Sequence, residues 1–190
     1  MFNKILPWLL LAFLSAPSWA ESKLGLGVGL ASGQSPYKHV STNNNLLPAY
    51  IIYESESFYF RVIEGGYYFW KQPLAPTRLR AAVLTRGRTE GYSTSDSKNF
   101  AGMESRSWSL DAGLSLSLQY NWRHHFNLKA VTDTLGKHQG QEISLGYAYA
   151  WRINDKLAFM PAFNASWFSG NLLDYYFGVK EREANSWRQA

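Results

Sequence analysis

The chain has 190 residues, of which 46% are hydrophobic, 16% aromatic and 17% charged, and its formal net charge is +5. The absence of cysteine excludes a disulfide-stapled secreted domain and a lipoprotein anchored through a modified cysteine. A mean hydropathy of −0.28 is too polar for a bundle of membrane-spanning helices. The small basic excess indicates a solvated loop surface, or attraction to anionic lipopolysaccharide or murein peptides, and we expect no nucleic-acid partner.

The N-terminal segment has the parts of a secretory signal peptide. Lys4 provides a positive charge, residues 5–13 form a mostly apolar stretch, and Ser18-Trp19-Ala20 is a small-x-small cleavage site. The apolar stretch is too short to span a membrane as a helix. The sequence therefore predicts a cleaved signal peptide over residues 1–20 and an exported domain over residues 21–190.

Short segments of alternating polarity follow the predicted signal peptide. In residues 24–30 leucine and valine alternate with glycine, which predicts a strand whose inner face carries no side chain. Residues 46–53 and 58–69 predict two further strands, joined by a tight polar turn at 54–57. The pair Gly65-Gly66 suggests a bulge inside the second of these strands.

A long strand is the clearest element of the sequence. After a less regular strand over 77–86 and a polar loop over 88–102, residues 105–121 alternate hydrophobic with small polar side chains. From Trp108 to Trp122 a strand rises about 46 Å, which is enough to cross the apolar band of a membrane even when tilted. Aromatic rings at both ends of such a strand are typical of a lipid-facing position. The predicted lipid-facing residues of this strand are Trp108, Leu110, Leu114, Leu116, Leu118, Tyr120 and Trp122.

The rest of the chain continues the same pattern. Residues 126–134 and 143–153 predict two strands, and Asn154-Asp155 turns the chain into a last strand over 157–167, where Pro161 indicates a bulge or an edge. The predicted lipid-facing residues of this part are Tyr147, Tyr149 and Trp151. No segment has a convincing amphipathic-helix pattern. We therefore predict an all-β fold, an antiparallel up-and-down transmembrane β-barrel of about eight strands, in contact with the lipid of a Gram-negative outer membrane.

The sequence offers no convincing catalytic or metal site. Its histidines lie in predicted loops or at strand ends, at His39, His124, His125 and His138. A metal site would need several of them to converge with carboxylates, and a serine hydrolase would need a histidine that an acid orients. His125, Asp111 and Asp133 could share a lumen, but serines are so frequent that such a combination arises by chance. We therefore expect no enzyme activity, no metal and no cofactor.

Motifs rich in tyrosine, proline and glycine are spread over the chain. They are Pro36-Tyr37, Leu47-Pro48-Ala49-Tyr50, Phe58-Tyr59-Phe60-Arg61, Gly65-Gly66-Tyr67-Tyr68, Asp133-Thr134-Leu135, and Asp174-Tyr175-Tyr176-Phe177-Gly178-Val179 followed by Glu181, Glu183, Ala184 and Arg188. With these motifs the chain resembles the MltA-interacting protein family, also called the MipA/OmpV-like outer-membrane family. The resemblance extends over nearly the whole mature chain, and the tyrosine-rich last motif is its most specific part.

The resemblance implies an outer-membrane β-barrel that acts as a scaffold for murein remodelling without catalysis of its own. The partners that it implies are a lytic transglycosylase and a bifunctional peptidoglycan synthase. The candidate partner-binding residues are Tyr175, Tyr176, Phe177, Gly178, Val179 and Glu183. The tyrosine cluster could equally form an interfacial girdle. Family members continue through further strands, whereas this sequence ends in the polar residues 187–190, so we expect C-terminal strands of the barrel to be missing.

The predicted strands leave the orientation in the membrane and the presence of a pore open. If the mature N-terminus is periplasmic, strand parity places the 88–102 loop and the tyrosine-rich motif in the periplasm and the Asn154-Asp155 turn outside. Barrels usually have short turns in the periplasm and long loops outside. The parity argument instead puts the long 88–102 loop in the periplasm and the short Asn154-Asp155 turn outside, so the two criteria conflict. A tyrosine-rich motif in the periplasm suits a scaffold. The opposite orientation exposes the motif outside the cell and suits an adhesin or surface receptor. A small-solute channel is a further alternative, because charged residues point inward by phase, namely Arg61, Lys129, Asp133, Glu142 and Arg152.

Overall fold

The structure, a computed structural model, describes residues 8–10, 23–32, 45–95, 98–154 and 157–186. Most of the predicted signal peptide lies outside these residues, as do the Pro36-Tyr37 motif, His39, Asp155 and Arg188. Residues 8–10 form a short strand within the predicted signal peptide, whose cleavage stays a prediction.

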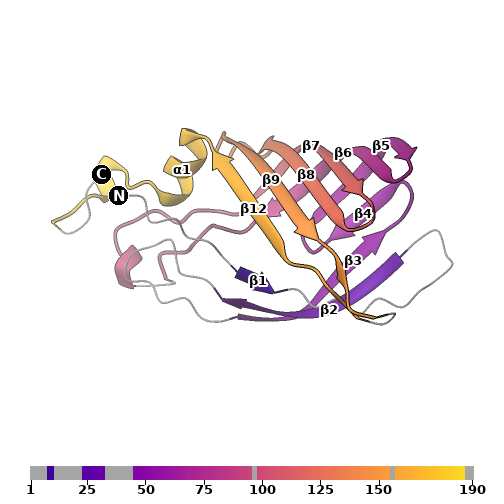
Figure 1. Cartoon of the computed structure of the whole chain (residues 1–190). Coiled ribbons are helices and arrows are strands. Elements are labelled where there is room, and N and C mark those ends of the chain that lie inside the picture. Colours follow the sequence, from indigo (N-terminus) through magenta and orange to yellow (C-terminus); the bar gives the residue numbers. More distant parts are fainter. Residues whose placement is uncertain (1–7, 11–22, 33–44, 96–97, 155–156, 187–190) are drawn as a thin grey trace.

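One antiparallel sheet of ten strands, in the order β1-β2-β3-β4-β5-β6-β7-β8-β9-β12, makes up most of the molecule (Figure 1). Neighbours in the sheet are therefore mostly neighbours along the chain, as the up-and-down prediction requires. A separate two-stranded sheet pairs β10 (Trp151–Arg152) with β11 (Ala158–Phe159). The strands of the main sheet are β1 (Trp8–Leu10), β2 (Lys23–Ser32), β3 (Asn45–Glu54), β4 (Phe58–Arg61), β5 (Glu64–Leu74), β6 (Thr77–Arg88), β7 (Ser109–Tyr120), β8 (His124–Asp133), β9 (Gln141–Tyr149) and β12 (Ala162–Phe168).

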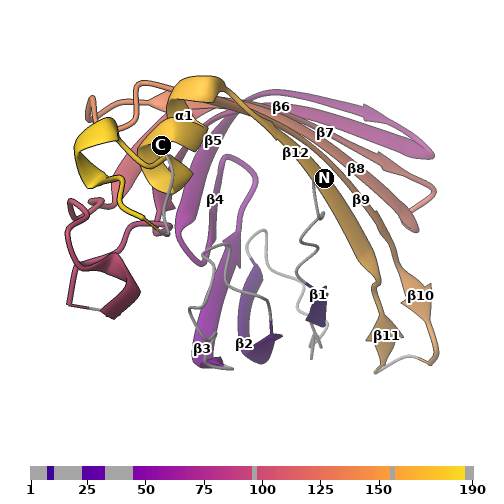
Figure 2. The same ribbon diagram turned by 90° about the vertical axis from the view of Figure 1, so that its left-hand side faces the viewer.

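The sheet curls around a central space, and the all-β prediction is confirmed. Figure 2 shows β6, β7, β8, β9 and β12 forming an arch, with β3 and β2 on the opposite side. Within the described residues the sheet is not closed, because β12 pairs with β9 and β1 pairs with β2, but β1 and β12 do not pair with each other.

The helical segments follow or interrupt the sheet. They are the α-helix α1 (Gly170–Phe177) and the 3-10 helices η1 (Lys98–Phe100) and η2 (Glu181–Glu183). The expectation that the chain contains no amphipathic helix is wrong at α1, where Leu172 and Tyr176 form a buried stripe one turn apart. Its eight residues are too few for the periodicity to stand out in the sequence. No helix among the described residues is long and apolar enough to cross a membrane.

The predicted strand over 58–69 is wrong, because two strands replace it. The chain reverses at Val62-Ile63, and β5 then runs back along β4, with Phe60 opposite Gly65 and Tyr59 opposite Gly66. Val62 adopts the left-handed conformation, with φ of 59°, and its N–H donates to the carbonyl of Ile51 at 3.0 Å. The register shift lies between Tyr68 and Trp70, not at the glycines, so the predicted bulge is displaced as well.

The sequence predicts a bulge or an edge at Pro161, and the structure shows a break between two strands there. Proline cannot donate a ladder hydrogen bond, and Pro161 lies between β11 and β12, where its carbonyl accepts from the N–H of Tyr149 at 3.0 Å. The segment predicted as one strand over 157–167 is accordingly divided into β11 and β12, and the segment over 143–153 into β9 and β10.

The two ends of the sheet differ in how they connect the strands. At one end, which we call the turn end, lie the short turns 55–57, 75–76 and 121–123 and the longer 150–161 connection, which contains β10 and β11. At the other end, which we call the loop end, lie the 89–108 loop with η1, the 134–140 loop and α1. Figure 1 shows α1 and the 89–108 loop at the same end of the molecule.

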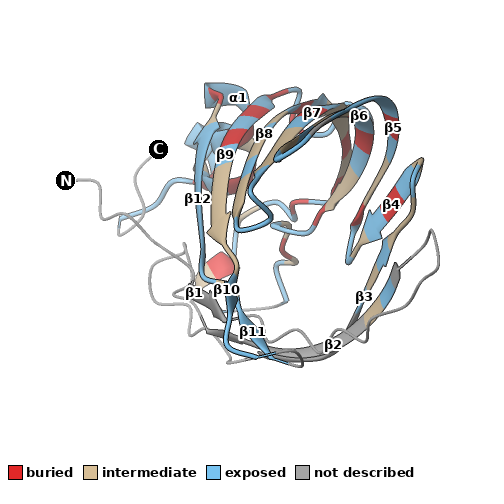
Figure 3. Ribbon diagram, turned by 45° about the vertical axis from the view of Figure 1, so that its right-hand side comes forward, coloured by how far each residue is buried: buried red, intermediate tan, exposed pale blue. Residues whose placement is uncertain are grey.

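The outer face of the sheet carries large hydrophobic side chains that are exposed in the isolated chain. Figure 3 shows exposed positions along the strands of the sheet, for example on β4, β5 and β12. Of the predicted lipid-facing residues, Trp108, Leu114, Leu116, Tyr120, Trp122 and Trp151 are exposed, and Leu110, Leu118, Tyr147 and Tyr149 are partly exposed. This face is continuous across strands, because Leu116 pairs with Leu128 and Leu128 pairs with Leu145. Such a patch fits a membrane contact, and contact with lipid stays a prediction for these residues.

Candidate functional site

The inner face of the sheet carries a network of paired charges near the loop end. Arg88 from β6 donates to Asp111 on β7 at 2.9 Å and to Glu142 on β9 at 2.5 Å, and its side chain is almost fully buried. Arg86 joins the same group through Glu142 at 2.5 Å. Alternation places these residues inward, and antiparallel pairing brings their strands side by side. Each buried charge therefore has an opposite charge beside it, as burial requires.

A second part of the network holds the 134–140 loop against β7 and β8. His138 Nε2 lies 2.9 Å from Asp111 Oδ1, and the Ser109 hydroxyl donates to Asp133 at 2.8 Å. Asp133 also accepts hydrogen bonds from the backbone N–H groups of Leu135, His138 and Gln139. These bonds fix the loop after β8 in one conformation.

Of the described residues, Asp111, Asp133 and His138 are the group that could hold a metal ion, since their ligand atoms lie within 4.8 Å of one another. The residues present do not favour a cation, because Arg88 already binds Asp111 and backbone N–H groups already surround Asp133. The donor set is thus satisfied by the protein itself, and the arrangement is structural.

The structure brings together part of the combination of aspartate, histidine and serine that a serine hydrolase would need. Asp111 and Asp133 are adjacent, but the histidine beside them is His138, whereas His125 pairs with Ala148 toward the turn end. Ser109 is fully buried and its hydroxyl donates to Asp133 instead of facing the imidazole. Nucleophilic attack would need a serine that a histidine deprotonates and that a substrate can reach, and this geometry provides neither.

The tyrosine-rich motif folds into α1 and packs against the loop end. Tyr176 is fully buried, its ring centroid lies 5.7 Å from that of His138, and its hydroxyl donates to the carbonyl of Ser107 at 3.3 Å. The N–H of Ser107 in turn donates to the hydroxyl of Tyr175 at 3.1 Å. Burial raises the pKa of the Tyr176 hydroxyl well above its usual value. Helix α1 is therefore attached to the paired-charge network through Tyr176 and His138.

Residues after α1 are held by a buried ion pair. Glu183 accepts from Arg106 at 2.8 Å, from the Glu104 N–H at 2.7 Å and from the Lys180 N–H at 2.9 Å. Burial alone would raise the pKa of Glu183, but these hydrogen bonds outweigh it and lower the pKa to about 2. The pKa of Arg106 is raised, because Glu183 outweighs the effect of its own burial.

The predicted partner-binding residues have different environments. Tyr176 and Glu183 are buried, Tyr175 and Val179 are partly exposed, and the Phe177 side chain is 37% exposed. Gly178 ends α1, and a Cβ atom there would overlap the carbonyl oxygen of Asp174. The buried residues of the motif thus stabilise the fold, and a partner-binding role stays a prediction for its exposed side chains.

Sequence reasoning missed Arg88, Arg106 and His138 as members of the site. Arg88 and Glu142 could have been found, because charges of opposite sign at inward phases of a curled sheet must pair. The Arg106 to Glu183 contact joins residues 77 positions apart, and no pattern within either segment indicates it.

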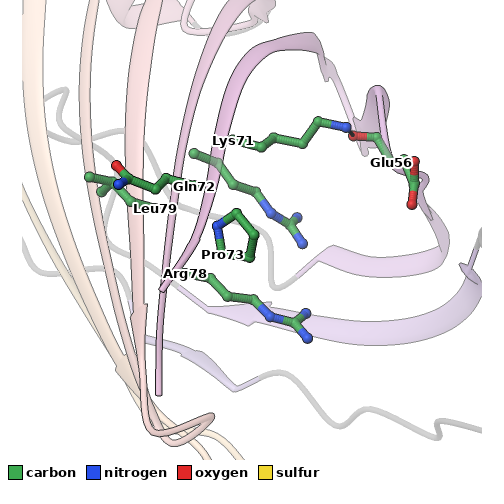
Figure 4. A pocket seen from close by; sticks show the side chains of 7 residues that line it. Glu56, Lys71, Gln72, Pro73, Arg78 and Leu79 are labelled. Atoms are coloured by element: carbon green, nitrogen blue, oxygen red, sulfur yellow. Dashed lines mark hydrogen bonds between the residues drawn. The ribbon is translucent and has the colours of Figure 1, made fainter. Parts of the chain in front are cut away.

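The turn end has a different arrangement of charges. A cavity of about 290 Å³ opens there, lined by Glu56, Lys71, Gln72, Pro73, Arg78, Leu79 and Arg80 (Figure 4). Arg80 forms an ion pair with Glu54 at 2.7 Å, and the Lys71 ammonium group donates to the Glu56 carbonyl at 2.6 Å. We call this cavity the turn-end mouth.

Comparison with known proteins finds relatives over most of the chain. The chain is 27% identical to MltA-interacting protein from Escherichia coli (strain K12) over 178 residues, covering 92% of this chain and 68% of the relative. It is 26% identical to the putative outer membrane protein YiaT from Escherichia coli O157:H7 over 174 residues, covering 88% of this chain and 66% of the relative. It is 26% identical over 198 residues to the 24 kDa outer membrane protein from Pasteurella multocida (strain Pm70), covering 96% of this chain and 72% of the relative.

No solved structure matches the chain. Two of these relatives carry names of outer-membrane proteins, and the predicted localisation in the outer membrane is confirmed. The family described as MltA-interacting protein MipA matches residues 26–190, which include β3 to β12 and the tyrosine-rich motif. The chain therefore belongs to the MltA-interacting protein MipA family.

Proposed function

We propose that this protein is a non-enzymatic scaffold of the outer membrane that binds murein-remodelling enzymes, a lytic transglycosylase first among them and a bifunctional peptidoglycan synthase second. The relative from Escherichia coli is named for its interaction with MltA, and this chain aligns with it over 92% of its length. The sheet offers a rigid frame on which such partners can assemble.

The observation that carries the proposal is that the buried polar groups of the inner face satisfy one another. Among the described side chains, Arg106 Nε is the buried nitrogen or oxygen atom that lacks a hydrogen-bond partner. A catalytic centre keeps groups with unused bonding capacity where a substrate can reach them, whereas a structural network uses that capacity internally. The inner face therefore supports the sheet, and recognition is left to the surfaces at its two ends.

The same pairing argues against the solute-channel alternative. Arg61 pairs with Glu54 at 2.8 Å and Lys129 with Glu64 at 2.5 Å, while Glu142 binds both Arg86 and Arg88. Charges that are already paired with one another on the inner face cannot replace the hydration shell of a passing ion. We expect little conductance when the purified protein is inserted into planar bilayers, and stable single-channel steps would contradict the scaffold proposal.

Binding to an enzyme tests the proposal directly. The protein, reconstituted in lipid nanodiscs, is immobilised and exposed to a purified lytic transglycosylase of the MltA type, with an unrelated eight-stranded outer-membrane barrel as the control surface. We expect saturable binding to this protein alone. Equal binding to both surfaces, or to neither, would refute the proposed function.

A further inference from the structure

We infer that the turn end faces the periplasm and that the turn-end mouth, around Lys71 and Arg78, docks an acidic segment of a periplasmic protein. The docking part rests on the proposed function, whereas the orientation does not. Under this inference the tyrosine-rich motif at the loop end faces the outside of the cell.

The hairpin β4–β5 changes the number of strands between the start of β2 and the 89–108 loop, and this number decides whether the two lie at the same end of the sheet. A single strand over 58–69 would place the start of β2 and the 89–108 loop at the same end. The reversal at Val62-Ile63 adds one crossing, so Lys23 at the start of β2 pairs with Glu54 beside the 55–57 turn. The N-terminal end of β2 therefore lies at the turn end, opposite the long loop.

Two independent criteria now agree. An exported chain reaches the outer membrane from the periplasm, so once the predicted signal peptide over 1–20, which includes β1, is removed, the mature chain enters the sheet from the periplasm at the start of β2. Outer-membrane barrels have short periplasmic turns and longer extracellular loops, and the turn end has connections such as 75–76 and 121–123. At the loop end, apart from the tight turn at Val62-Ile63, the 89–108 and 134–140 connections are longer than the 55–57, 75–76 and 121–123 turns, and 89–108 is also longer than the 150–161 connection of the turn end. Both criteria place the turn end in the periplasm.

The turn-end mouth is rich in cations. Lys71 pairs with Arg80 across β5 and β6, and Pro73 pairs with Arg78, so these side chains share the inner face of the sheet. Figure 4 shows Lys71 and Arg78 extending to the same side, with the ring of Pro73 between them. Arg78 is exposed, and no described residue forms a hydrogen bond or ion pair with it. At the loop end, by contrast, Arg86 and Arg88 are paired with carboxylates.

These features fit a carboxylate-bearing protein segment. A guanidinium group binds a carboxylate in a bidentate manner, and arginine is enriched at the centres of protein interfaces. The lysine beside it provides a second, less directional charge, and the proline offers a rigid apolar surface between the two. An acidic side chain entering the mouth would therefore meet two cations, of which Lys71 uses one hydrogen bond on the Glu56 carbonyl.

The orientation is tested by labelling single cysteines, since the chain contains none of its own. Arg123→Cys lies at the turn end and Ala101→Cys at the loop end, and both positions are exposed. Intact cells are treated with a membrane-impermeant maleimide, before and after permeabilisation of the outer membrane. We expect Ala101→Cys to react on intact cells and Arg123→Cys to react only after permeabilisation, and the reverse pattern would overturn the orientation.

The docking surface is tested by charge reversal in the nanodisc assay with the lytic transglycosylase. We expect the double variant Lys71→Glu/Arg78→Glu to bind about 30-fold or more weakly, because a central pair of interface charges is reversed. Arg123→Glu is the matched control, because it reverses one charge at the same end but outside the mouth, and its affinity should stay near that of the wild type. Heat-modifiable migration on gels verifies folding, and Lys71→Gln/Arg78→Gln replaces the double variant if that variant does not fold.

The outcomes separate the docking surface from the proposed function. If the wild type binds but the double variant binds equally well, while Phe177→Ala loses affinity, the tyrosine-rich motif is the docking surface and the inference is wrong. If the wild type binds no transglycosylase, the proposed function and the docking surface both fail, and the labelling result still decides the orientation. If the wild type sediments with isolated murein sacculi and the double variant does not, murein carboxylates occupy the mouth and the protein partner is refuted.

Discussion

Arg106 and Glu183 decide how the segment after α1 is attached to the sheet. Both side chains are 1% exposed, and the ion pair between them joins residues 77 positions apart. Around them, Lys180 and Arg182 pair with Glu104 at the surface, where solvent screens the attraction. The buried pair therefore carries most of the electrostatic attachment of this segment.

Acid should release this segment. A carboxyl group whose pKa is about 2 when folded and 4.5 ordinarily contributes stability that is present above 4.5 and is lost as the pH falls toward 2. The contribution corresponds to about 3 kcal/mol. We expect amide hydrogen exchange over 178–186 to accelerate in that pH interval while β7 stays protected. Glu183→Gln should exchange rapidly already at neutral pH, and Glu181→Gln, an exposed neighbour, should behave as the wild type.

Tyr176 and Phe177 are adjacent but should respond differently to truncation. Tyr176→Ala leaves a cavity between α1 and His138 and should cost about 3–5 kcal/mol, whereas Tyr176→Phe keeps the ring and loses the hydroxyl group that contacts Ser107. Phe177→Ala should leave stability nearly unchanged, because that side chain is exposed. Urea unfolding of the lipid-reconstituted protein measures all three variants, and an equal loss for Tyr176→Ala and Phe177→Ala would refute the buried position of Tyr176.

At the scale of elements, the β4–β5 hairpin depends on a close approach between its strands. Gly66 faces Tyr59 across the pair, and a Cβ atom at Gly66 would overlap the Tyr59 ring, which is itself buried and cannot move aside. The neighbouring Gly65 has room, because its Cβ would lie 3.6 Å from the Phe60 side chain.

Alanine substitutions at these two glycines should therefore differ. We expect Gly66→Ala to lower the free energy of unfolding by about 1–3 kcal/mol through overpacking, and Gly65→Ala to change it little. Denaturant titration in lipid vesicles provides the comparison. Similar effects of the two substitutions would show that Tyr59 does not pack on Gly66, and would leave the hairpin without its support.

The whole molecule presents opposite surfaces to its surroundings, a hydrophobic outer face and a polar inner face. Leu114 is 54% exposed on the outer face, while Ser115 beside it is buried on the inner face. If lipid covers the outer face, an arginine is most costly at the middle of the membrane and less costly near the headgroups.

The depth of the outer face in the membrane can be measured with arginine substitutions. Leu114→Arg should cost about 2–4 kcal/mol, and Trp108→Arg, on the same face near the start of β7, about 0–1 kcal/mol. Folding into lipid vesicles from urea measures both variants. Equal costs at the two positions would contradict a membrane-spanning β7.

Local patterns were enough for most strands and for the face each side chain occupies. The alternation around Leu114 and Ser115 predicts β7, and Pro161 indicates an irregularity where the structure has the break before β12, because both signals act on adjacent residues. The turn at Val62-Ile63 was missed, because hydrophobic residues on both sides of it continue the strand pattern and the reversal rests on pairing with β3 and β6. Helix α1 was missed because packing on His138, not periodicity, stabilises so short a helix.

By itself the sequence determined an exported, all-β, outer-membrane chain with one hydrophobic face and one polar face, because strand alternation and aromatic ends are properties of neighbouring residues. Only the tertiary structure decided which charges are buried together, as in Arg88 with Glu142 and Arg106 with Glu183, and to which end of the sheet each loop belongs. These features depend on contacts between residues far apart in the chain. The added reversal at Val62-Ile63 moves every later loop to the opposite end of the sheet, and no local sequence pattern indicates that reversal.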